Sequence, residues 1–342
     1  MEGQLRTTGA HTGPLQGIRV LEFGQILAAP HCGLLLKALG AEVIKVERPP
    51  RGDPSRHDPF LFGPGLSGYF LQQNIGKRSL CLDLRHPDGR DVLRALIPLC
   101  DVVLENLRPG VLDQAGLGYQ DVRSLRQDIV MCSISAYGKS GGPRAGQSGF
   151  GPIVEALVGI PDQTGDPDGP PMPTQVPIAD YVTASHAFGA IVAALFLRER
   201  TGEGSFIDMA LLDCAFAMHD WAVQIYLGSQ GRQRLRRRGL RSEVSVPWGM
   251  FRCRDGEYVL VMAETDGLWA ALVALLGDRS LMDTARFGTQ RARTQHAPEV
   301  YARLQTWIDG YPTAADVVRE LDCAGPTFRT SHGAFGENFR QS

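Results

Sequence analysis

A strand, a helix and a second strand follow one another near the start of the chain, and this order constrains the fold more than any other feature. Residues 18–23 (IRVLEF) have the apolar, β-branched character of a strand. Residues 31–39 form a helical stretch that Gly40 ends, and Glu42–Glu47 reads as a second strand. A helix that joins two neighbouring strands requires parallel pairing and a right-handed crossover. The start of the chain therefore predicts a parallel sheet.

The same alternation continues as far as residue 227. Gly- and Pro-rich loops are expected at residues 48–68 and 138–169. The pattern predicts a doubly wound, Rossmann-like α/β domain over residues 15–227. Its further strands are expected at residues 80–84, 101–104, 128–135 and 205–208, and its further helices at 87–98, 181–199 and 211–227.

A second, smaller domain is expected after a linker at residues 228–245. Two apolar runs joined by an Arg-Asp-Gly turn predict a hairpin of residues 249–252 and 258–262. Helical stretches follow at residues 265–276, 299–310 and 313–323. These elements predict a small α+β domain over residues 246–325, with a tail, 326–342, that has no helical or strand period.

The composition excludes several classes of function. A chain of 342 residues with 43% hydrophobic and 21% charged residues can bury a core. Its net charge of −2 gives no general attraction to nucleic acid or to an anionic membrane. The longest apolar run, residues 187–197, is half of the roughly 20 residues that a membrane span needs, and residues 1–14 hold no apolar signal core. We expect a cytoplasmic protein with neither nucleic acid nor a membrane as partner.

Motifs for tightly bound cofactors and metals fail on their context. Residues 63–68 (GPGLSG) have GxGxxG spacing, but a loop rather than a strand precedes them. Residues 138–142 (GKSGG) match GxSxG, but Pro143 follows where a nucleophile elbow needs a helix. The seven cysteines form no CxxC pair and the eight histidines no HxH or HxxxH pair, so we expect neither a metal nor a disulfide framework. Six arginines within residues 232–241 are more typical of a solvated surface than of an anion site.

Asp180 is the candidate nucleophile. Proline is not tolerated inside a helix, so the helix that contains residues 181–199 begins at or after Pro177. Asp180 then lies near the helix N-terminus, where the backbone dipole favours an ionised carboxylate. An ordinary helix N-cap is the alternative interpretation of the same residue.

Five segments in one order carry a resemblance to a known family. They are LQGIRVLEF at residues 15–23, LGAEVIKVE at 39–47, NIGKRS at 74–79, DVVLENLRPG at 101–110 and QVPIAD at 175–180. Together they resemble the family III coenzyme A transferases, which include formyl-CoA, carnitine-CoA and succinyl-CoA transferases and the α-methylacyl-CoA racemases. The likeness runs from about residue 17 to residue 325. It implies a Rossmann-like large domain and an interlocked homodimer.

The resemblance also implies the ligands. The substrates would be an acyl-CoA and a small carboxylic acid, with no permanently bound cofactor, because the coenzyme A thioester is itself a substrate. Cations suit the phosphates of coenzyme A, and loop amides at a helix start can hold an anion. Gln114 stands where many relatives carry an arginine, which would weaken one phosphate contact. The implied coenzyme A contacts lie in the loop at residues 24–30 and beyond it: Gln25, Ala28, Arg48, Lys77, Asn106 and Arg108.

By the same resemblance, Asp180 would attack the acyl-CoA carbonyl to give a mixed anhydride and a coenzyme A thiolate. The thiolate would then attack the aspartyl carbonyl and form an enzyme-bound thioester. An acceptor carboxylate would reverse these steps and leave as the new acyl-CoA. Two nucleophilic steps replace one difficult exchange.

Two alternatives remain at this point. The racemase branch of the family takes its base and acid from a Gly-His-Asp segment, where this chain has Phe150 and Gly151, so an acyl-CoA racemase or epimerase is disfavoured. The other alternative is an incomplete, non-catalytic member. Family chains return to the large domain after the small one, and we expect that return segment to be missing here, since the sequence ends at Ser342.

Overall fold

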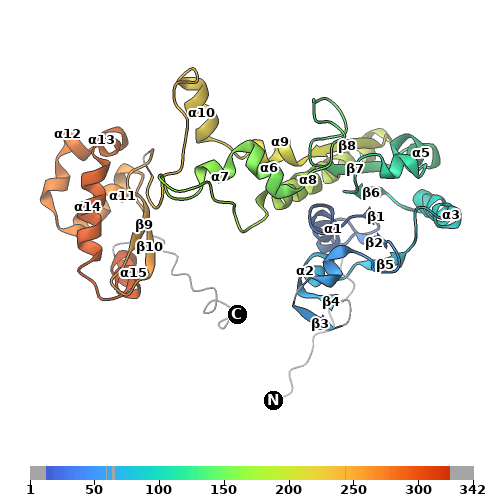
Figure 1. The fold of residues 1–342 in the computed structure, drawn as a ribbon, viewed down its shortest axis with the longest axis horizontal. Coiled ribbons are helices and arrows are strands. Elements are labelled where there is room, and N and C mark those ends of the chain that lie inside the picture. Colours follow the sequence, from blue (N-terminus) through green and yellow to red (C-terminus); the bar gives the residue numbers. More distant parts are fainter. Residues whose placement is uncertain (1–12, 59, 64–65, 243, 324–342) are drawn as a thin grey trace, which may run out of the picture. The chain divides into compact units, whose positions relative to one another are not determined.

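The computed structural model describes residues 13–58, 60–63, 66–242 and 244–323 of the chain (Figure 1). The chain divides into two compact units. The first consists of residues 1–161 and 173–235, and the second of residues 162–172 and 236–342. The tail expected at residues 326–342 lies outside the described residues.

The first unit is built on a six-stranded parallel sheet with the strand order β5-β2-β1-β6-β7-β8. This confirms the predicted Rossmann-like α/β class. Val20 of the central strand pairs with Val43 on one side and with Val102 on the other. The strands are β1 Arg19–Phe23, β2 Glu42–Glu47, β5 Arg78–Cys81, β6 Val102–Glu105, β7 Val130–Ser135 and β8 Ser205–Ala210.

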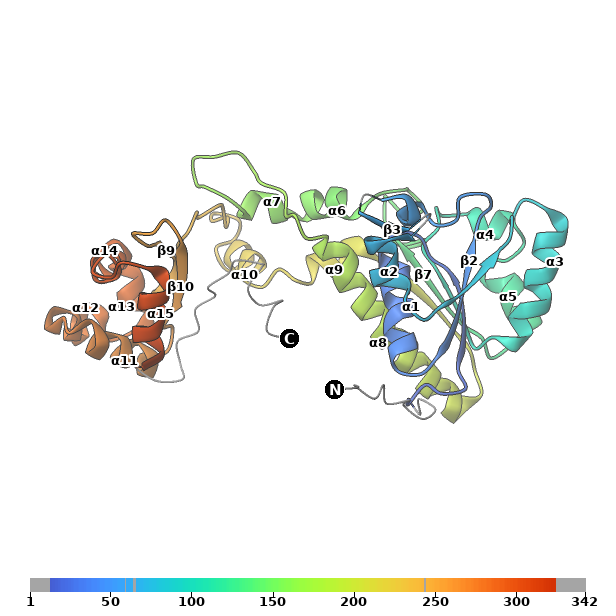
Figure 2. The same ribbon diagram turned by 90° about the horizontal axis from the view of Figure 1, so that it is seen from below.

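Helices cover both faces of this sheet (Figure 2). Successive strand residues point to opposite faces, so Val20 packs in the core beneath α1 and α8 while Leu21 packs in the core beneath α3 and α5. Strands buried on both faces explain the continuous apolar runs of the sequence. The helices of this unit are α1 Ala28–Ala38, α2 Gly68–Asn74, α3 Pro87–Leu96, α4 Val111–Gln114, α5 Tyr119–Leu125, α6 Gly151–Val158, α8 Ile178–Thr201, α9 Leu211–Phe216 and α10 Trp221–Gly228.

The strand order places a crevice at the carboxyl ends of β1 and β6. The chain leaves β1 toward β2 on one side, and it later returns to β6 on the other side of β1. Ligands of open α/β sheets bind at such a reversal of strand order. The residues that follow β1, β2 and β6 are therefore the first place to look for a site.

Two helices, α6 and α7 (Ile160–Gln163), lie within the loop expected at residues 138–169, and α2 begins where the loop expected at residues 48–68 ends. In α2 the Ser67 side chain accepts a hydrogen bond from the Phe70 amide and so starts the helix. Pro152 in the first turn suits the start of α6, and Gly159 in the left-handed conformation ends it. Two short 3-10 helices, a two-stranded ribbon and a short helix complete these connections: Pro54–His57, Ile97–Leu99, β3 Leu61–Gly63 with β4 Leu66–Ser67, and α7 Ile160–Gln163.

Two helix boundaries also differ from expectation. Helix α1 begins at Ala28 rather than at residue 31, because a proline, here Pro30, is tolerated in a first turn. The single helix expected at residues 211–227 is interrupted, and Asp220 accepts a hydrogen bond from the Trp221 amide at the start of α10.

Helix α8 is the one described helix that is long and apolar enough to cross a membrane, with a mean hydropathy of 1.4 over an 18-residue stretch. It packs on α1, α9, β7 and β8 within the first unit. Its buried Arg198 forms an ion pair of 3.2 Å with Asp101. A core helix of a folded domain passes the same length and composition test, so α8 is weak evidence for a span.

The second unit contains the predicted hairpin, whose strands are antiparallel, and a set of helices that share one core. Thr265 caps the first of these helices through the Leu268 amide. The fully buried guanidinium of Arg293 donates to the carbonyl oxygens of Val246, Glu264 and Phe287. The elements are β9 Trp248–Arg252, β10 Tyr258–Met262, α11 Asp266–Leu276, a 3-10 helix Arg279–Met282, α12 Thr284–Phe287, α13 Gln290–Gln295, α14 Ala297–Ile308 and α15 Ala314–Cys323.

Candidate functional site

A pocket of about 510 Å³ lies at the carboxyl ends of the central strands in the first unit. It is bordered by the loop after β1, the loop after β6, the segment that leads into α6 and the first turn of α8. Five residues proposed from the sequence line it together: Gln25, Ala28, Asn106, Arg108 and Asp180.

The loop after β1 is held by two side chains from other segments. The Gln25 amide donates to Asn106 Oδ1 at 2.8 Å, and Asn106 Nδ2 donates to the Gln25 carbonyl oxygen at 3.0 Å. The Ile26 amide donates to the Asp53 carboxylate at 3.2 Å, which supports the left-handed backbone of Ile26 at φ 64°. The Asn106 side chain thus positions the loop that presents Gln25.

The loop leads directly into helix α1. Leu27 occupies the N-cap position and provides no side-chain cap, and Ala28 is the first helical residue. First-turn amides that no side chain satisfies, together with the helix dipole, favour a negative charge at this border of the pocket.

A second pocket of about 720 Å³ adjoins the first, since Gln25, Leu107 and Arg108 line both. Arg48 lies in this second pocket, and so does Gln114. Arg48 and Arg108 are exposed, and within the described part of the chain neither side chain makes a hydrogen bond or ion pair. Their guanidinium groups are therefore available to an anionic ligand.

Two further arginines of the second pocket were missed by sequence reasoning. Arg85 forms an ion pair of 2.7 Å with Asp83, and its hydrogen bonds hold the pKa of that carboxyl below its ordinary value. Arg90 donates to the carbonyl oxygen of Leu84. The lining holds four arginines and one aspartate, so the pocket has a positive balance. A signal was present in the sequence, because both arginines closely follow the predicted strand at residues 80–84.

Lys77 is not brought together with the other proposed coenzyme A contacts. Its side chain is only 2% exposed. The Lys77 ammonium donates to Glu22 Oε2 at 2.8 Å, to the Pro30 carbonyl oxygen at 2.7 Å and to Asn74 Oδ1 at 3.0 Å. An ammonium group has three protons, so all of them are used. Burial lowers the pKa of Lys77, although Glu22 acts in the opposite direction. Lys77 serves as a buried counter-ion of Glu22 and is not placed for a phosphate contact.

Asp180 is the third residue of α8, and Pro177 occupies the N-cap position. The N-cap interpretation of Asp180 is therefore wrong. Within the described ranges, no group donates a hydrogen bond to its carboxylate or forms an ion pair with it. Burial, and after it the charge of Glu155, raises the pKa of Asp180 to about 6. The dipole at a helix N-terminus would lower the pKa of Asp180, but desolvation raises it and is the larger effect.

Gly151, Phe150 and Tyr69 line the pocket together with Asp180. A Cβ atom at Gly151 would lie 2.0 Å from Asp180 Oδ2, so only glycine leaves room for the carboxylate in this position. Phe150 is 69% exposed and lines the pocket. Burial and the neighbouring Tyr181 and Asp180 raise the pKa of Tyr69 to about 12, so it remains a neutral hydroxyl at physiological pH.

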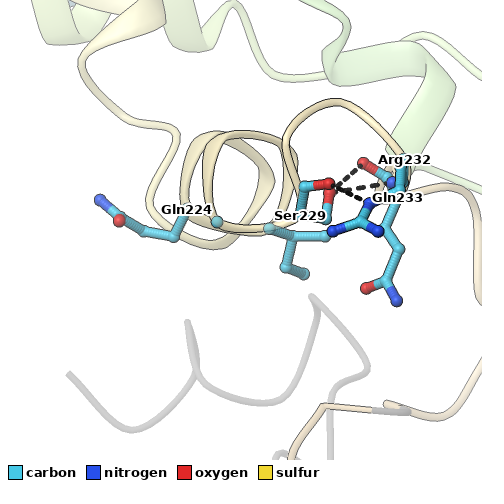
Figure 3. A pocket seen from close by; sticks show the side chains of 6 residues that line it. Gln224, Ser229, Arg232 and Gln233 are labelled. Atoms are coloured by element: carbon cyan, nitrogen blue, oxygen red, sulfur yellow. Dashed lines mark hydrogen bonds between the residues drawn. The ribbon is translucent and has the colours of Figure 1, made fainter.

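A separate hollow of about 510 Å³ lies on α10 and the turn that follows it (Figure 3). Its charged lining residue, Arg232, donates through Nε to the Ser229 carbonyl oxygen at 3.0 Å. The Ser229 hydroxyl in turn accepts from the Gln233 amide at 2.9 Å. The lining of this hollow contains neither a carboxylate nor a thiol, so the chemistry is assigned to the pocket of Asp180.

No group of three or more His, Cys, Asp or Glu side chains in the described residues is arranged to hold a metal ion. The described residues that line the Asp180 pocket also include no histidine. The polar groups of the two pockets include one unpaired carboxylate, helix-start amides, a neutral phenol and free guanidinium groups.

Comparison with known proteins gives one consistent family. The model of the family described as CoA-transferase family III matches residues 15–335. Among curated relatives, the beta subunit of succinyl-CoA–L-malate CoA-transferase from Chloroflexus aurantiacus is 35% identical over 92% of this chain and 78% of its own length. The succinate–glutarate CoA-transferase of Agrobacterium fabrum is 38% identical over 86% of this chain and 74% of its own.

A mammalian relative and two solved structures are also similar to this chain. The succinyl-CoA:glutarate CoA-transferase of Mus musculus is 36% identical over 84% of this chain, which corresponds to 65% of the mouse protein. The structure of a CAIB/BAIF family protein from Brucella suis superposes with a TM-score of 0.82 at 34% identity, covering 96% of this chain and 86% of that one. The Rv3272 protein of M. tuberculosis gives a TM-score of 0.83 at 30% identity, with 97% and 87% covered.

Proposed function

This chain belongs to CoA-transferase family III, and from that premise we propose that it transfers coenzyme A from an acyl-CoA to a free carboxylic acid through a thioester at Asp180. The observation that carries the proposal is the unpaired, buried carboxylate of Asp180 in a pocket that adjoins an arginine-lined one. Such a carboxylate is weakly solvated, and weak solvation favours nucleophilic attack.

The two pockets suit the two ends of an acyl-CoA. In this proposal Arg48, Arg85, Arg90 and Arg108 bind the phosphates, and the acyl thioester lies in the smaller pocket against Asp180. The shared residues Gln25 and Arg108 mark the passage between the pockets. Gln114 supplies an amide rather than a charge there, so these four arginines carry the phosphate recognition.

The reaction then follows from the residues present. Asp180 adds to the thioester carbonyl, the C–S bond breaks, and a mixed anhydride and a thiolate result. The thiolate adds to the aspartyl carbonyl, and the donor acid leaves with one of the Asp180 oxygen atoms. The acceptor carboxylate repeats both steps in reverse, so no net proton or electron is consumed. In this proposal, amides at the start of α1 stabilise the negative charge of the tetrahedral intermediates.

The names of the relatives indicate where a substrate search should begin. The three curated relatives described above are named for the transfer of coenzyme A between succinate or succinyl-CoA and a second dicarboxylic acid. We propose succinyl-CoA as the first donor to test and glutarate and malate as the first acceptors. The predicted cytoplasmic location stays a prediction.

Exchange of isotope-labelled free acid into acyl-CoA tests the function. Labelled succinate is expected to enter succinyl-CoA in the presence of EDTA, because the proposed steps use only side chains and coenzyme A. Mass spectrometry of the thioester pool gives the readout, over a panel of donors and acids. Solvent exchange of the acyl α-proton without entry of any labelled acid would favour a racemase instead.

Assembly as a homodimer is part of the proposal. Several large apolar side chains of α6, α8, α9 and α10 are exposed in the single chain, among them Phe196 at 62%, Trp221 at 51% and Leu227 at 64%. Apolar surface of this kind is typical of a protein interface. Light scattering is expected to give twice the chain mass of 37.2 kDa, and an active monomer would contradict the assembly.

A further inference from the structure

We propose that Glu155 is a positioning residue for Asp180: its buried carboxylate fixes the start of helix α8, from which the nucleophile projects. This inference rests on the proposed role of Asp180 and assigns a function to a carboxylate outside the five segments that carry the family resemblance. Glu155 lies on α6 and is 3% exposed, so its charge is almost completely removed from solvent.

Both oxygen atoms of Glu155 bind the segment that presents Asp180. Oε1 accepts from the Ala179 amide at 3.1 Å, and Oε2 accepts from the Thr174 hydroxyl at 2.6 Å. Ala179 is in the first turn of α8 and Thr174 precedes Pro177, so the carboxylate bridges the two sides of this helix start. Pro177 provides no side-chain cap, and Glu155 replaces that missing cap from a neighbouring helix.

The same face of α6 approaches the nucleophile one helical turn earlier. Gly151 and Glu155 are four residues apart, a spacing that puts both on one side of a helix. Gly151 leaves the space that Asp180 Oδ2 occupies, and Glu155 fixes the backbone of the preceding residue, Ala179. Helix α6 therefore determines where the Asp180 carboxylate can lie.

The charges around Asp180 make Glu155 the group that acts on its ionisation. From α2, Tyr69 faces Asp180 as a neutral phenol. From α1, His31 packs on Tyr181, and from α9 the Cys214 thiol lies near Thr183. Besides burial, Glu155 is the group that raises the pKa of Asp180. Like charges close together in a poorly solvated site favour the protonated form of one of them.

Two functional consequences follow. The nucleophile is ionised only above about pH 6, so transfer falls as the pH drops through that value. Once Asp180 is acylated its charge is gone, and the repulsion from Glu155 ends. Glu155 therefore destabilises the free carboxylate relative to the covalent intermediate, which favours the attack.

The test compares Glu155→Gln, Glu155→Ala and the control Glu199→Gln, an exposed carboxylate on the last turns of α8. Glu155→Gln retains an oxygen for the Ala179 amide but removes the charge. In wild type, kcat is expected to fall as the pH drops through about 6. In Glu155→Gln this fall should lie at a lower pH, but not as low as for an ordinary aspartate, because burial is the larger cause of the raised pKa of Asp180 and it remains. Glu155→Ala loses the bridge, and kcat is expected to fall by about 10- to 100-fold with little change in the KM for acyl-CoA.

The outcomes separate this inference from the proposed function. The transferase proposal stands if the wild-type protein exchanges label and Asp180→Asn does not. The role of Glu155 is then refuted if Glu155→Gln keeps the wild-type pH dependence of kcat and Glu155→Ala keeps the wild-type kcat. If the wild-type protein exchanges no label with any donor, the transferase proposal itself fails. The inference is supported if kcat falls at a lower pH in Glu155→Gln than in wild type, while Glu199→Gln keeps the wild-type pH dependence.

Discussion

Asp180→Asn is expected to lower the rate of coenzyme A transfer by at least about 10³-fold, because an amide cannot form the mixed anhydride. Binding of coenzyme A should change little, since the arginine-lined pocket does not include residue 180. The rate of label exchange and the affinity for coenzyme A measured by calorimetry give the two readouts. Asparagine can deamidate to aspartate, so mass spectrometry of the Asp180 peptide must accompany each assay.

The same substitution is expected to stabilise the fold at neutral and higher pH. The folded-state pKa of Asp180 is raised from 3.8 to about 6, so this group favours folding fully at low pH and loses that effect as the pH rises between those values. A shift of that size corresponds to about 3 kcal/mol of cost for the ionised form. Asp180→Asn removes the charge, so the free energy of unfolding is expected to rise by up to that amount at neutral pH. The buried, unpaired amide of the asparagine reduces this gain.

Urea unfolding at pH 5 and pH 8 measures this effect. The free energy of unfolding of Asp180→Asn should exceed that of the wild type at pH 8, and the difference should shrink at pH 5. Glu199→Gln, on the same helix but exposed, is the control and should show neither change. Full transfer activity in Asp180→Asn protein of verified mass would refute the nucleophile assignment.

Gly151→Ala is expected to lower kcat by about 100-fold without unfolding the protein. The new Cβ would meet Asp180 Oδ2 at 2.0 Å, so the carboxylate must leave its place against α6, and a misplacement of about 1 Å can have that effect. Gly151 is the first residue of α6, where alanine favours the helix. The KM for acyl-CoA should stay within about twofold, because Gly151 does not line the arginine-rich pocket that is proposed for the phosphates.

Gly189→Ala is the matched control. Gly189 lies within α8, and a Cβ there would meet no other atom within 4 Å. Both variants gain the same methyl group in a helix, so a difference in kcat between them reports the contact with Asp180. Equal kcat values for Gly151→Ala, Gly189→Ala and the wild type would show that the position of the carboxylate in this structure is not the reactive one.

Much of the fold could be predicted because its central strands are buried on both faces. Apolar, β-branched runs bounded by Gly and Pro place β1, β2, β6 and β7 to within about two residues. Helix α6 escaped prediction, because the many Gly and Pro residues around it indicated loop, although GPIVEALV between Gly151 and Gly159 has the apolar character of a helix. Gly and Pro here mark the two ends of the helix rather than its absence.

The residues of the candidate pocket could be predicted from sequence where they follow the ends of strands. Gln25, Asn106 and Arg108 follow β1 and β6, and the carboxyl ends of parallel strands meet at one edge of a sheet. The position of the Lys77 ammonium could not be predicted in this way, because the direction of a long side chain is not visible in sequence. The sequence did indicate a buried cation, because Glu22 is a carboxylate at a buried strand position and such a charge needs a partner.

The pKa of Asp180 could not be obtained from sequence for a similar reason. Proximity to a helix N-terminus predicts a lowered pKa, but burial and Glu155 act in the opposite direction and prevail. Glu155 comes from a segment that was expected to be a loop. A charge balance of this kind depends on distances that only the folded chain defines.

Chemical trapping of the covalent intermediate tests the central claim most directly. The protein is incubated with succinyl-CoA and no acceptor, then treated with hydroxylamine, digested and analysed by peptide mass spectrometry, with a parallel sample that lacks the thioester. We predict a hydroxamate on the peptide that contains Asp180, located at that residue, only when succinyl-CoA or another donor that supports exchange is present. Robust label exchange with the same donor, with no modification at Asp180 or with the hydroxamate at Glu155 instead, would contradict the account.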